Sequence, residues 1–279
     1  MRLYKRALTR TPDWQHIWVR VYSQKHTGRK GRGEKRNPTT ESVKAHNQRM
    51  RIKEVHVYIL SYFREGDHWL CLTYDDNHVP ESEEEALNNV RNFKRRIDRK
   101  CKPLEIEVFA LWNVEKGAEK ERFHHHMIMN QEVERELIEE CWGYGIILFK
   151  RLDDKAYNSD DYYSLAEYIV KQSTAETCDG KKNRPAYHKT RNIKKPITKI
   201  SDVQEMEVKE FKDYEVVDVE EHTDPITGLI SLEYRMKSKV KEPQKHWHRG
   251  KPAAFRKAYP TYNDYMEEQL SLFEEGVRT

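Results

Sequence analysis

Three consecutive histidines in the segment ERFHHHMIMN, residues 121–130, have a spacing that suits metal binding. In a β-strand, alternate side chains point to opposite faces, so His124 and His126 project together while His125 joins the apolar side chains of the segment. Two neutral imidazoles from one strand suit a divalent cation, provided that a third ligand completes the site. The alternative is that the histidines form a polar patch or part of a core. The spacing therefore predicts a His-x-His metal site that depends on a neighbouring strand.

A carboxylate on the preceding segment is the candidate for the third ligand. In LEIEVFALWNVE, residues 104–115, every even-numbered position is apolar, which is typical of a strand with one buried face. The polar turn KGAEKE joins this segment to the histidines and favours an antiparallel hairpin, in which Glu115 would pair with His124. Glu115 would then be the third metal ligand. The competing interpretation is that Glu115 is a solvated hairpin residue, and that Glu121 or no carboxylate completes the site.

A tyrosine and a lysine three residues apart, Tyr168 and Lys171, supply a possible nucleophile with a charge partner. In a helix both side chains lie on one face, whereas Tyr162 and Tyr163 are spaced so that neither joins that face. A Y-x-x-K pattern arises easily by chance in a chain with 16 tyrosines, and an amphipathic core tyrosine is the alternative explanation. If this helix carries chemistry, Tyr168 alone makes the attack.

The elements that must position these residues predict an α+β domain. Strands are expected at about 67–75, 104–115, 121–130 and 144–152, and helices at about 83–99, 131–142 and 162–172. Ser82 and Glu85 form a capping box at the start of the first of these helices. The order strand, helix, strand, strand, helix, strand, helix is that of a ferredoxin-like antiparallel sheet covered by helices on one side. The second face of the sheet would be open to ligands.

The N-terminal region is strongly basic. Residues 1–53 hold 15 Lys and Arg against 3 Asp and Glu, a balance of +12, and since the whole chain carries +4 the remainder carries −8. A basic arm on an acidic body is common in nucleic-acid binders, because neutralising phosphates releases counterions; the alternative is a solubilising tail. We expect a loop over residues 23–38 to contact the phosphate backbone. Its candidate DNA-binding residues are Arg29, Lys30, Arg32, Lys35 and Arg36.

Aromatic residues and a predicted helix also belong to this N-terminal region. Trp14, Trp18 and Tyr22 recur at four-residue spacing, which suits either stacking on bases or packing in an amphipathic turn or strand. A helix with Thr40 as its N-cap is expected over about 39–63. Its apolar residues increase toward the C-terminal end, which would dock on the body of the protein.

The C-terminal region, residues 201–279, is expected to be an accessory module. Residues 210–240 predict a β-hairpin joined through a DPITG turn. A second His-x-His, His246 and His248, lies between prolines without apolar alternation and is interpreted as a surface loop. The final residues predict a short amphipathic helix. The expected division is thus a basic arm and helix at 1–53, a central domain at 54–200 and this accessory region.

Several classes of protein are disfavoured by the composition. The longest apolar runs, VFALW and GIILF, are far shorter than the roughly 20 residues of a membrane span, and no signal peptide is recognised, so a cytoplasmic location is expected. Four cysteines without a C-x-x-C motif argue against a disulfide framework and a zinc ribbon. No G-x-x-x-x-G-K-[ST] motif is present, so an attached helicase domain is not expected.

Three segments occur in a fixed order, WLCLTY (69–74), FHHHMIMN (123–130) and YIVK (168–171). Together they resemble the HUH endonuclease superfamily, and in particular the rolling-circle replication initiators of phages, prophages and plasmids. In that family an L-T-Y or L-T-F strand accompanies the H-x-H strand that binds the metal, and a Y-x-x-K helix carries the nucleophile. The resemblance covers roughly residues 55–200 and implies the HUH endonuclease fold. His125 departs from the family, which usually has an apolar residue at that position.

A basic stretch, RPAYHKTRNIKKP at 184–196, also looks like a loop that such proteins carry after the tyrosine helix. Its cationic side chains would contact phosphates. The candidate DNA-binding residues of this stretch are Arg184, Lys189, Arg191, Lys194 and Lys195.

The resemblance implies site-specific nicking and joining of single-stranded or stem-loop origin DNA in a bacterial host cell. His124, His126 and Glu115 would hold Mn or Mg near the scissile phosphate, Tyr168 would form a 5′-phosphotyrosine, and Lys171 would assist. A host helicase and polymerase are the implied partners. Two alternatives stay open, namely a transposase or relaxase of the same superfamily and a non-catalytic nucleic-acid-binding module on a ferredoxin-like sheet.

Overall fold

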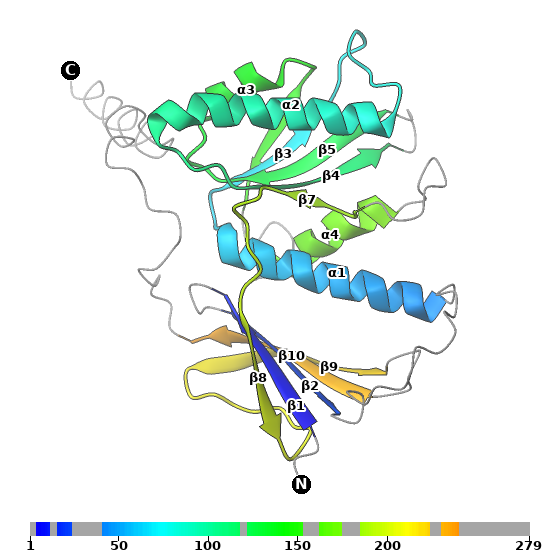
Figure 1. Ribbon diagram of the computed structural model, residues 1–279, viewed down its shortest axis with the longest axis vertical. Helices are drawn as coiled ribbons and strands as arrows, with labels where there is room; N and C mark the ends of the chain where they lie inside the picture. The colour runs from blue at the N-terminus through cyan, green and yellow to red at the C-terminus, as the bar shows by residue number, and fades with distance from the viewer. Residues whose placement is uncertain are drawn as a thin grey trace, which may run out of the picture. The chain divides into compact units, whose positions relative to one another are not determined.

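The computed structural model describes residues 4–11, 16–23, 41–117, 122–152, 162–174, 185–223 and 230–239. This part of the chain is α+β, with two antiparallel five-stranded sheets and four α-helices, so the predicted class is confirmed (Figure 1). It divides into two compact units. Of the described residues, unit 1 contains those up to Tyr62, residues 162–170 and those from Lys194 onward, and unit 2 contains the rest.

Unit 2 carries the predicted ferredoxin-like order of elements. They are β3 (His68–Leu72), α2 (Glu83–Cys101), β4 (Ala110–Lys116), β5 (Phe123–Met129), α3 (Arg135–Trp142), β6 (Ile147–Arg151) and β7 (His188–Lys189). The strands are ordered β6-β3-β5-β4-β7 and every pairing is antiparallel. The helices α2 and α3 lie on one side of this sheet (Figure 1). The histidine strand β5 is therefore central, and hydrogen bonding to both neighbours fixes its register.

Helix α2 begins where the sequence predicts. The Ser82 side chain accepts a hydrogen bond from the Glu85 backbone N–H at 3.2 Å, which satisfies one of the donors left over at a helix start. The Glu85 carboxylate accepts from the N–H of Glu81, not from that of Ser82, so the capping box is modified. The apolar stripe of the helix is fully buried in the core of unit 2: Ala86, Val90, Phe93, Ile97 and Cys101.

The strand predicted over 104–115 is shorter in the structure. Residues Lys102–Leu104 form a 3-10 turn, Glu105 follows with a left-handed φ of 55°, and β4 begins only at Ala110. The predicted alternation still holds, because the even-numbered side chains of 106–112 are buried in the core.

Unit 1 contains a sheet that joins both ends of the described chain. Its elements are β1 (Tyr4–Arg10), β2 (His16–Ser23), α1 (Glu41–Tyr62), β8 (Thr198–Val203), β9 (Tyr214–Thr223), β10 (Ile230–Ser238) and most of α4 (Tyr163–Thr174). The strand order is β8-β1-β2-β10-β9. The predicted C-terminal hairpin is confirmed as β9 and β10, and β10 pairs with the N-terminal strand β2. That long-range pairing was not predicted.

The helices of unit 1 pack around Trp18, which lies in β2. The indole Nε1 of Trp18 donates to His56 of α1 at 3.0 Å, and the ring of Tyr163 in α4 lies 5.4 Å from that of His56. The Arg235 guanidinium of β10 lies 4.4 Å from the Tyr163 ring centre, within cation–π range. Trp18 is therefore a packed strand residue, which is one of the two roles expected for it.

Some predictions concern residues outside the described ranges. These are the N-cap Thr40, the second His-x-His, the C-terminal helix and the basic residues Arg29, Lys30, Arg32, Lys35, Arg36 and Arg184. Among the described residues, no helix is both long and apolar enough to cross a membrane. The three described cysteines, Cys71, Cys101 and Cys141, are all free thiols.

Candidate metal centre

The strands β4 and β5 pair in the predicted register. Glu115 lies opposite His124, and Asn113 lies opposite His126. The backbone N–H of Gly117 donates to the carbonyl of Arg122 at 2.9 Å and continues this ladder beyond β4. Because alternate side chains of a strand share a face, this register places Glu115, His124 and His126 together on one face of the sheet.

The three side chains converge on a small volume. One carboxylate oxygen of Glu115, Oε2, lies 3.2 Å from Nε2 of His124 and 3.2 Å from Nε2 of His126. All three candidate ligand atoms lie within 4.8 Å of one another. Within the ranges described, this is the one group of three or more His, Cys, Asp or Glu side chains that could hold a metal ion. The sequence-predicted triad is thus assembled by the fold.

Hydrogen bonding sets the charge state of this triad. Burial alone would raise the pKa of Glu115, but the hydrogen bonds from His124 and His126 lower it to about 2. The same hydrogen bond to Glu115 raises the pKa of His124. Two imidazole nitrogens and an ionised carboxylate oxygen form a donor set that divalent transition-metal ions accept. The residues present therefore fit a metal ion.

A tryptophan that the sequence analysis did not single out holds one of the ligands. Trp69 of β3 stacks on the His126 ring, with centroids 5.4 Å apart and an interplanar angle of 14°. His126 is 8% exposed, whereas the side chains of His124 and Glu115 are partly open to solvent. The site is thus accessible from the His124 side. Period-2 alternation within WLCLTY would have placed Trp69 on this face.

The middle histidine faces the opposite side of the sheet, as predicted. His125 is fully buried, and its Nε2 lies 2.7 Å from the hydroxyl of Tyr74. Its ring also makes an edge contact with Trp142 of α3, with centroids 5.8 Å apart. Burial lowers the pKa of His125 to about 3, so the ring stays neutral. His125 is therefore a core residue.

The L-T-Y segment after β3 has a structural role in this arrangement. Thr73 donates its hydroxyl to the carbonyl of Ile146 at 2.8 Å, and its own carbonyl accepts from the Trp142 indole at 2.8 Å. Gly145 has a φ of 159° and passes so close that an added Cβ would lie 2.5 Å from the Thr73 carbonyl oxygen. These contacts attach the end of β3 to the segment before β6, beside the residue that contacts His125.

Tyr168 lies in α4, as predicted. Leu165, Ile169 and Val170 of this helix are fully buried, and Tyr168 is partly exposed. The Lys171 side chain lies outside the described residues. The helix belongs to unit 1 as far as Val170, whereas the histidine triad lies in unit 2. An approach of Tyr168 to the triad is accordingly part of the function proposed below.

The candidate DNA-binding residues near β7 have different surroundings. Lys189 donates to the carbonyl of Ile193 at 2.7 Å, and Lys195 forms an exposed ion pair with Glu54 at 3.3 Å. Arg191 and Lys194 are exposed. Phosphate contact by these residues stays a prediction.

Comparison with protein families gives a match over the centre of the chain. Residues 67–173 match the family model of the replication-associated protein ORF2 and its relatives. The matched range runs from the start of β3 into α4 and contains the three triad residues, Tyr168 and Lys171. No curated protein and no solved structure gives a significant match to the chain.

Proposed function

We propose that this protein initiates rolling-circle DNA replication by metal-dependent nicking and joining of single-stranded origin DNA. The observation that carries the proposal is the convergence of Glu115, His124 and His126 on one face of the unit 2 sheet. The match to a replication-associated family over this same segment supports a role in replication initiation. The fold alone would not support it, because ferredoxin-like sheets serve many unrelated functions.

Glu115, His124 and His126 are the residues that would hold the metal ion. When bound, the ion would act as a Lewis acid on the scissile phosphate and stabilise negative charge on its oxygens. The mixed nitrogen and oxygen donor set favours Mn²⁺ over Mg²⁺, since Mg²⁺ prefers oxygen ligands in octahedral geometry. Trp69, stacked on His126, restricts the rotation of that imidazole and so keeps its Nε2 directed at Glu115.

Tyr168 is the proposed nucleophile. Its phenolate oxygen would attack the phosphorus, and the bond from phosphorus to the 3′ oxygen would break. The products would be a phosphotyrosine linked to the 5′ end and a 3′-hydroxyl that takes up a proton. The buried apolar side chains of α4 anchor the helix while Tyr168 stays partly exposed. Lys171 would neutralise charge on the phosphate or position the phenolate.

The nature of the substrate and partners follows from this chemistry. A tyrosine on a helix must reach an unpaired strand, so the substrate would be single-stranded DNA or an extruded stem-loop. The 3′-hydroxyl would serve a host polymerase as primer, with a host helicase separating the strands. The energy of the broken bond is retained in the phosphotyrosine, so the reverse reaction would rejoin the strand.

Labelled oligonucleotides test the proposal. Single-stranded oligonucleotides that tile the DNA around the gene are incubated with the protein and Mn²⁺, then separated under denaturing conditions. A 3′-end label is expected to become covalently attached to protein, whereas a 5′-end label is expected on a shortened free strand. Chelation with EDTA should abolish both products. Cleavage that persists in EDTA would overturn the metal role.

Two tyrosine variants identify the nucleophile. Tyr168→Phe is expected to form no covalent adduct, because the attacking oxygen is absent. Tyr163→Phe is the matched control, since it removes a hydroxyl from the same helix at a residue packed against His56 and Arg235. The control should keep the adduct. Equal adduct formation by both variants would show that Tyr168 is not the nucleophile, and absence of any adduct with the parent protein would favour a non-catalytic binding module.

A further inference from the structure

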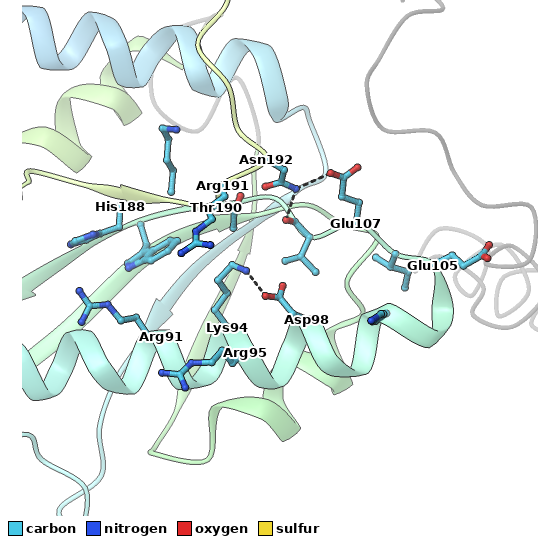
Figure 2. Close-up of a pocket in the computed structure, with 15 residues that line it drawn as sticks. Arg91, Lys94, Arg95, Asp98, Glu105, Glu107, His188, Thr190, Arg191 and Asn192 are labelled. Atoms are coloured by element: carbon cyan, nitrogen blue, oxygen red, sulfur yellow. Dashed lines mark hydrogen bonds and ion pairs between the residues drawn. The ribbon is translucent and has the colours of Figure 1, made fainter.

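A groove with a volume of about 960 Å³ lies in unit 2, between α2 and the segment that contains β7 (Figure 2). One wall carries Arg91, Lys94 and Arg95 of α2, and the other carries residues 188–192 (Figure 2). The side chain of Trp112 on β4 also lines the groove. Trp112 belongs to the alternate set that faces α2, whereas Glu115 faces the other way. The groove and the metal centre therefore lie on opposite faces of the same sheet.

Positive charge predominates in this groove. Six Lys and Arg side chains line it, against three Asp and Glu. Two of the acidic groups are engaged: Asp98 pairs with Lys94, and Glu107 accepts from Asn192 at 3.0 Å. The cations and the acids are separated. In Figure 2 the cationic side chains gather toward one end, beside His188, and Glu105 and Glu107 lie toward the other.

Three of the cations are available to a ligand. Arg95, Lys102 and Arg191 are exposed and form no ion pair with any described residue. Arg95 lies one helical turn after Arg91, a separation of about 6 Å along the helix axis at 1.5 Å per residue. Lys102 follows two turns later, on the same side of α2. A series of cations along one wall suits an extended polyanion better than a single small anion.

An aromatic pair with an unsatisfied donor lies beside these cations. Trp112 is 6% exposed, and its indole N–H is buried without a hydrogen-bond acceptor among the described residues. Its ring stacks on that of His188, with centroids 5.7 Å apart and an interplanar angle of 22°. A buried donor without an acceptor is unfavourable, so a ligand oxygen that reaches it would satisfy it. Aromatic rings next to phosphate-binding cations are a feature of single-strand binding surfaces.

We propose that this groove binds the sugar–phosphate backbone of single-stranded DNA, as a second contact separate from the metal centre. The phosphates would follow Arg91, Arg95 and Arg191, and the acidic residues at the opposite end would repel them and limit the path of the strand. An acidic peptide would match the charge but would gain nothing from the Trp112–His188 pair. The binding requires neither metal nor attack by Tyr168, so it can be tested independently of the nicking reaction.

Binding is measured with the full-length protein in EDTA, using a fluorescein-labelled 20-nucleotide oligo-dT and fluorescence anisotropy over a range of salt concentrations. The groove variant is Arg95→Ala/Lys102→Ala/Arg191→Ala. Its matched control is Arg99→Ala/Lys100→Ala/Arg135→Ala, which removes three exposed cations of unit 2 that do not line the groove. Both variants change the net charge equally, so nonspecific attraction by the rest of the chain is the same in both.

The groove variant is expected to bind roughly tenfold more weakly than the control variant, and its log–log salt slope should be smaller by about 2, because each phosphate contact on a single strand contributes about 0.7. Equal affinities and slopes for the two variants would overturn the proposal. So would equal groove-dependent binding of a labelled poly-glutamate peptide, which would identify an acidic-peptide site.

Cross-linking gives an independent readout that does not depend on mutation. Oligo-dT carrying 5-iodouracil is irradiated in complex with the parent protein, and the cross-linked peptides are identified by mass spectrometry. Peptides containing Trp112, His188 or residues 91–102 are expected. Cross-links confined to other parts of the chain would place the strand elsewhere and overturn the proposal.

Discussion

The imidazole Nε2 of His125 lies 2.7 Å from the hydroxyl of Tyr74 in the core of unit 2. This hydrogen bond joins the middle histidine of β5 to the L-T-Y segment that follows β3. Both residues are buried, and both rings contact Trp142 of α3. The residue between the two metal ligands is thereby held from the helix side of the sheet, which leaves His124 and His126 directed to the other side.

The three histidines are predicted to divide their effects between stability and metal binding. His125→Ala should lower the free energy of unfolding by roughly 2–4 kcal/mol, because it leaves a cavity and an unpaired Tyr74 hydroxyl. His124→Ala should change stability in EDTA much less but abolish measurable Mn²⁺ binding. Urea unfolding in EDTA and calorimetric titration with Mn²⁺ separate the two effects. The reverse pattern would mean that the strand faces are assigned wrongly.

Removing only the Tyr74 hydroxyl isolates the hydrogen bond from the ring packing. Tyr74→Phe keeps the aromatic contact with Trp142 and is expected to destabilise unit 2 by about 1–3 kcal/mol, since it leaves a buried imidazole nitrogen unsatisfied. In the background of His125→Ala the same substitution should cost much less, because the partner is already absent. Additive effects in this double-mutant cycle, measured by urea unfolding, would show that the hydrogen bond contributes nothing.

Glu115→Gln tests the third ligand with almost no change of size. Substitutions outside the ligand sphere alone cost roughly 10- to 100-fold in metal affinity, so loss of this charged ligand should cost more. In the parent protein, Mn²⁺ at 100 times its dissociation constant should stabilise the fold by about 2.7 kcal/mol. Glu115→Gln should lose that stabilisation in thermal unfolding, whereas Glu139→Gln, an exposed carboxylate of α3, should keep it. Full retention by Glu115→Gln would favour a site without this carboxylate.

Gly145 is predicted to be the more sensitive of two glycines near β6. Gly145→Ala would place a Cβ 2.5 Å from the Thr73 carbonyl oxygen and should destabilise the protein by more than about 2 kcal/mol, because backbone must move. Gly143 has a φ of 64°, but a Cβ there would meet only Arg96 at 3.8 Å. Gly143→Ala should therefore cost only about 1 kcal/mol. Equal losses in urea unfolding would show that the close approach at Gly145 is relieved without cost.

The sequence by itself determined the local part of this site. Period-2 alternation assigned His125 to one face and its two neighbours to the other, and the polar turn fixed the pairing of Glu115 with His124. These features depend on neighbours within about a dozen residues, where strand geometry and a short connection leave few alternatives. The capping box at Ser82 and the order of elements in unit 2 were predictable for the same reason.

Only the tertiary structure decided the features that join distant segments. The pairing of β2 with β10 links residues more than 200 positions apart, and the groove brings Arg91 beside His188. The packing of Tyr163 against Trp18 and His56 is another such feature. No local periodicity specifies which segment covers a given apolar or charged surface, because several partners would bury it equally well. The choice is made by the packing of the whole unit.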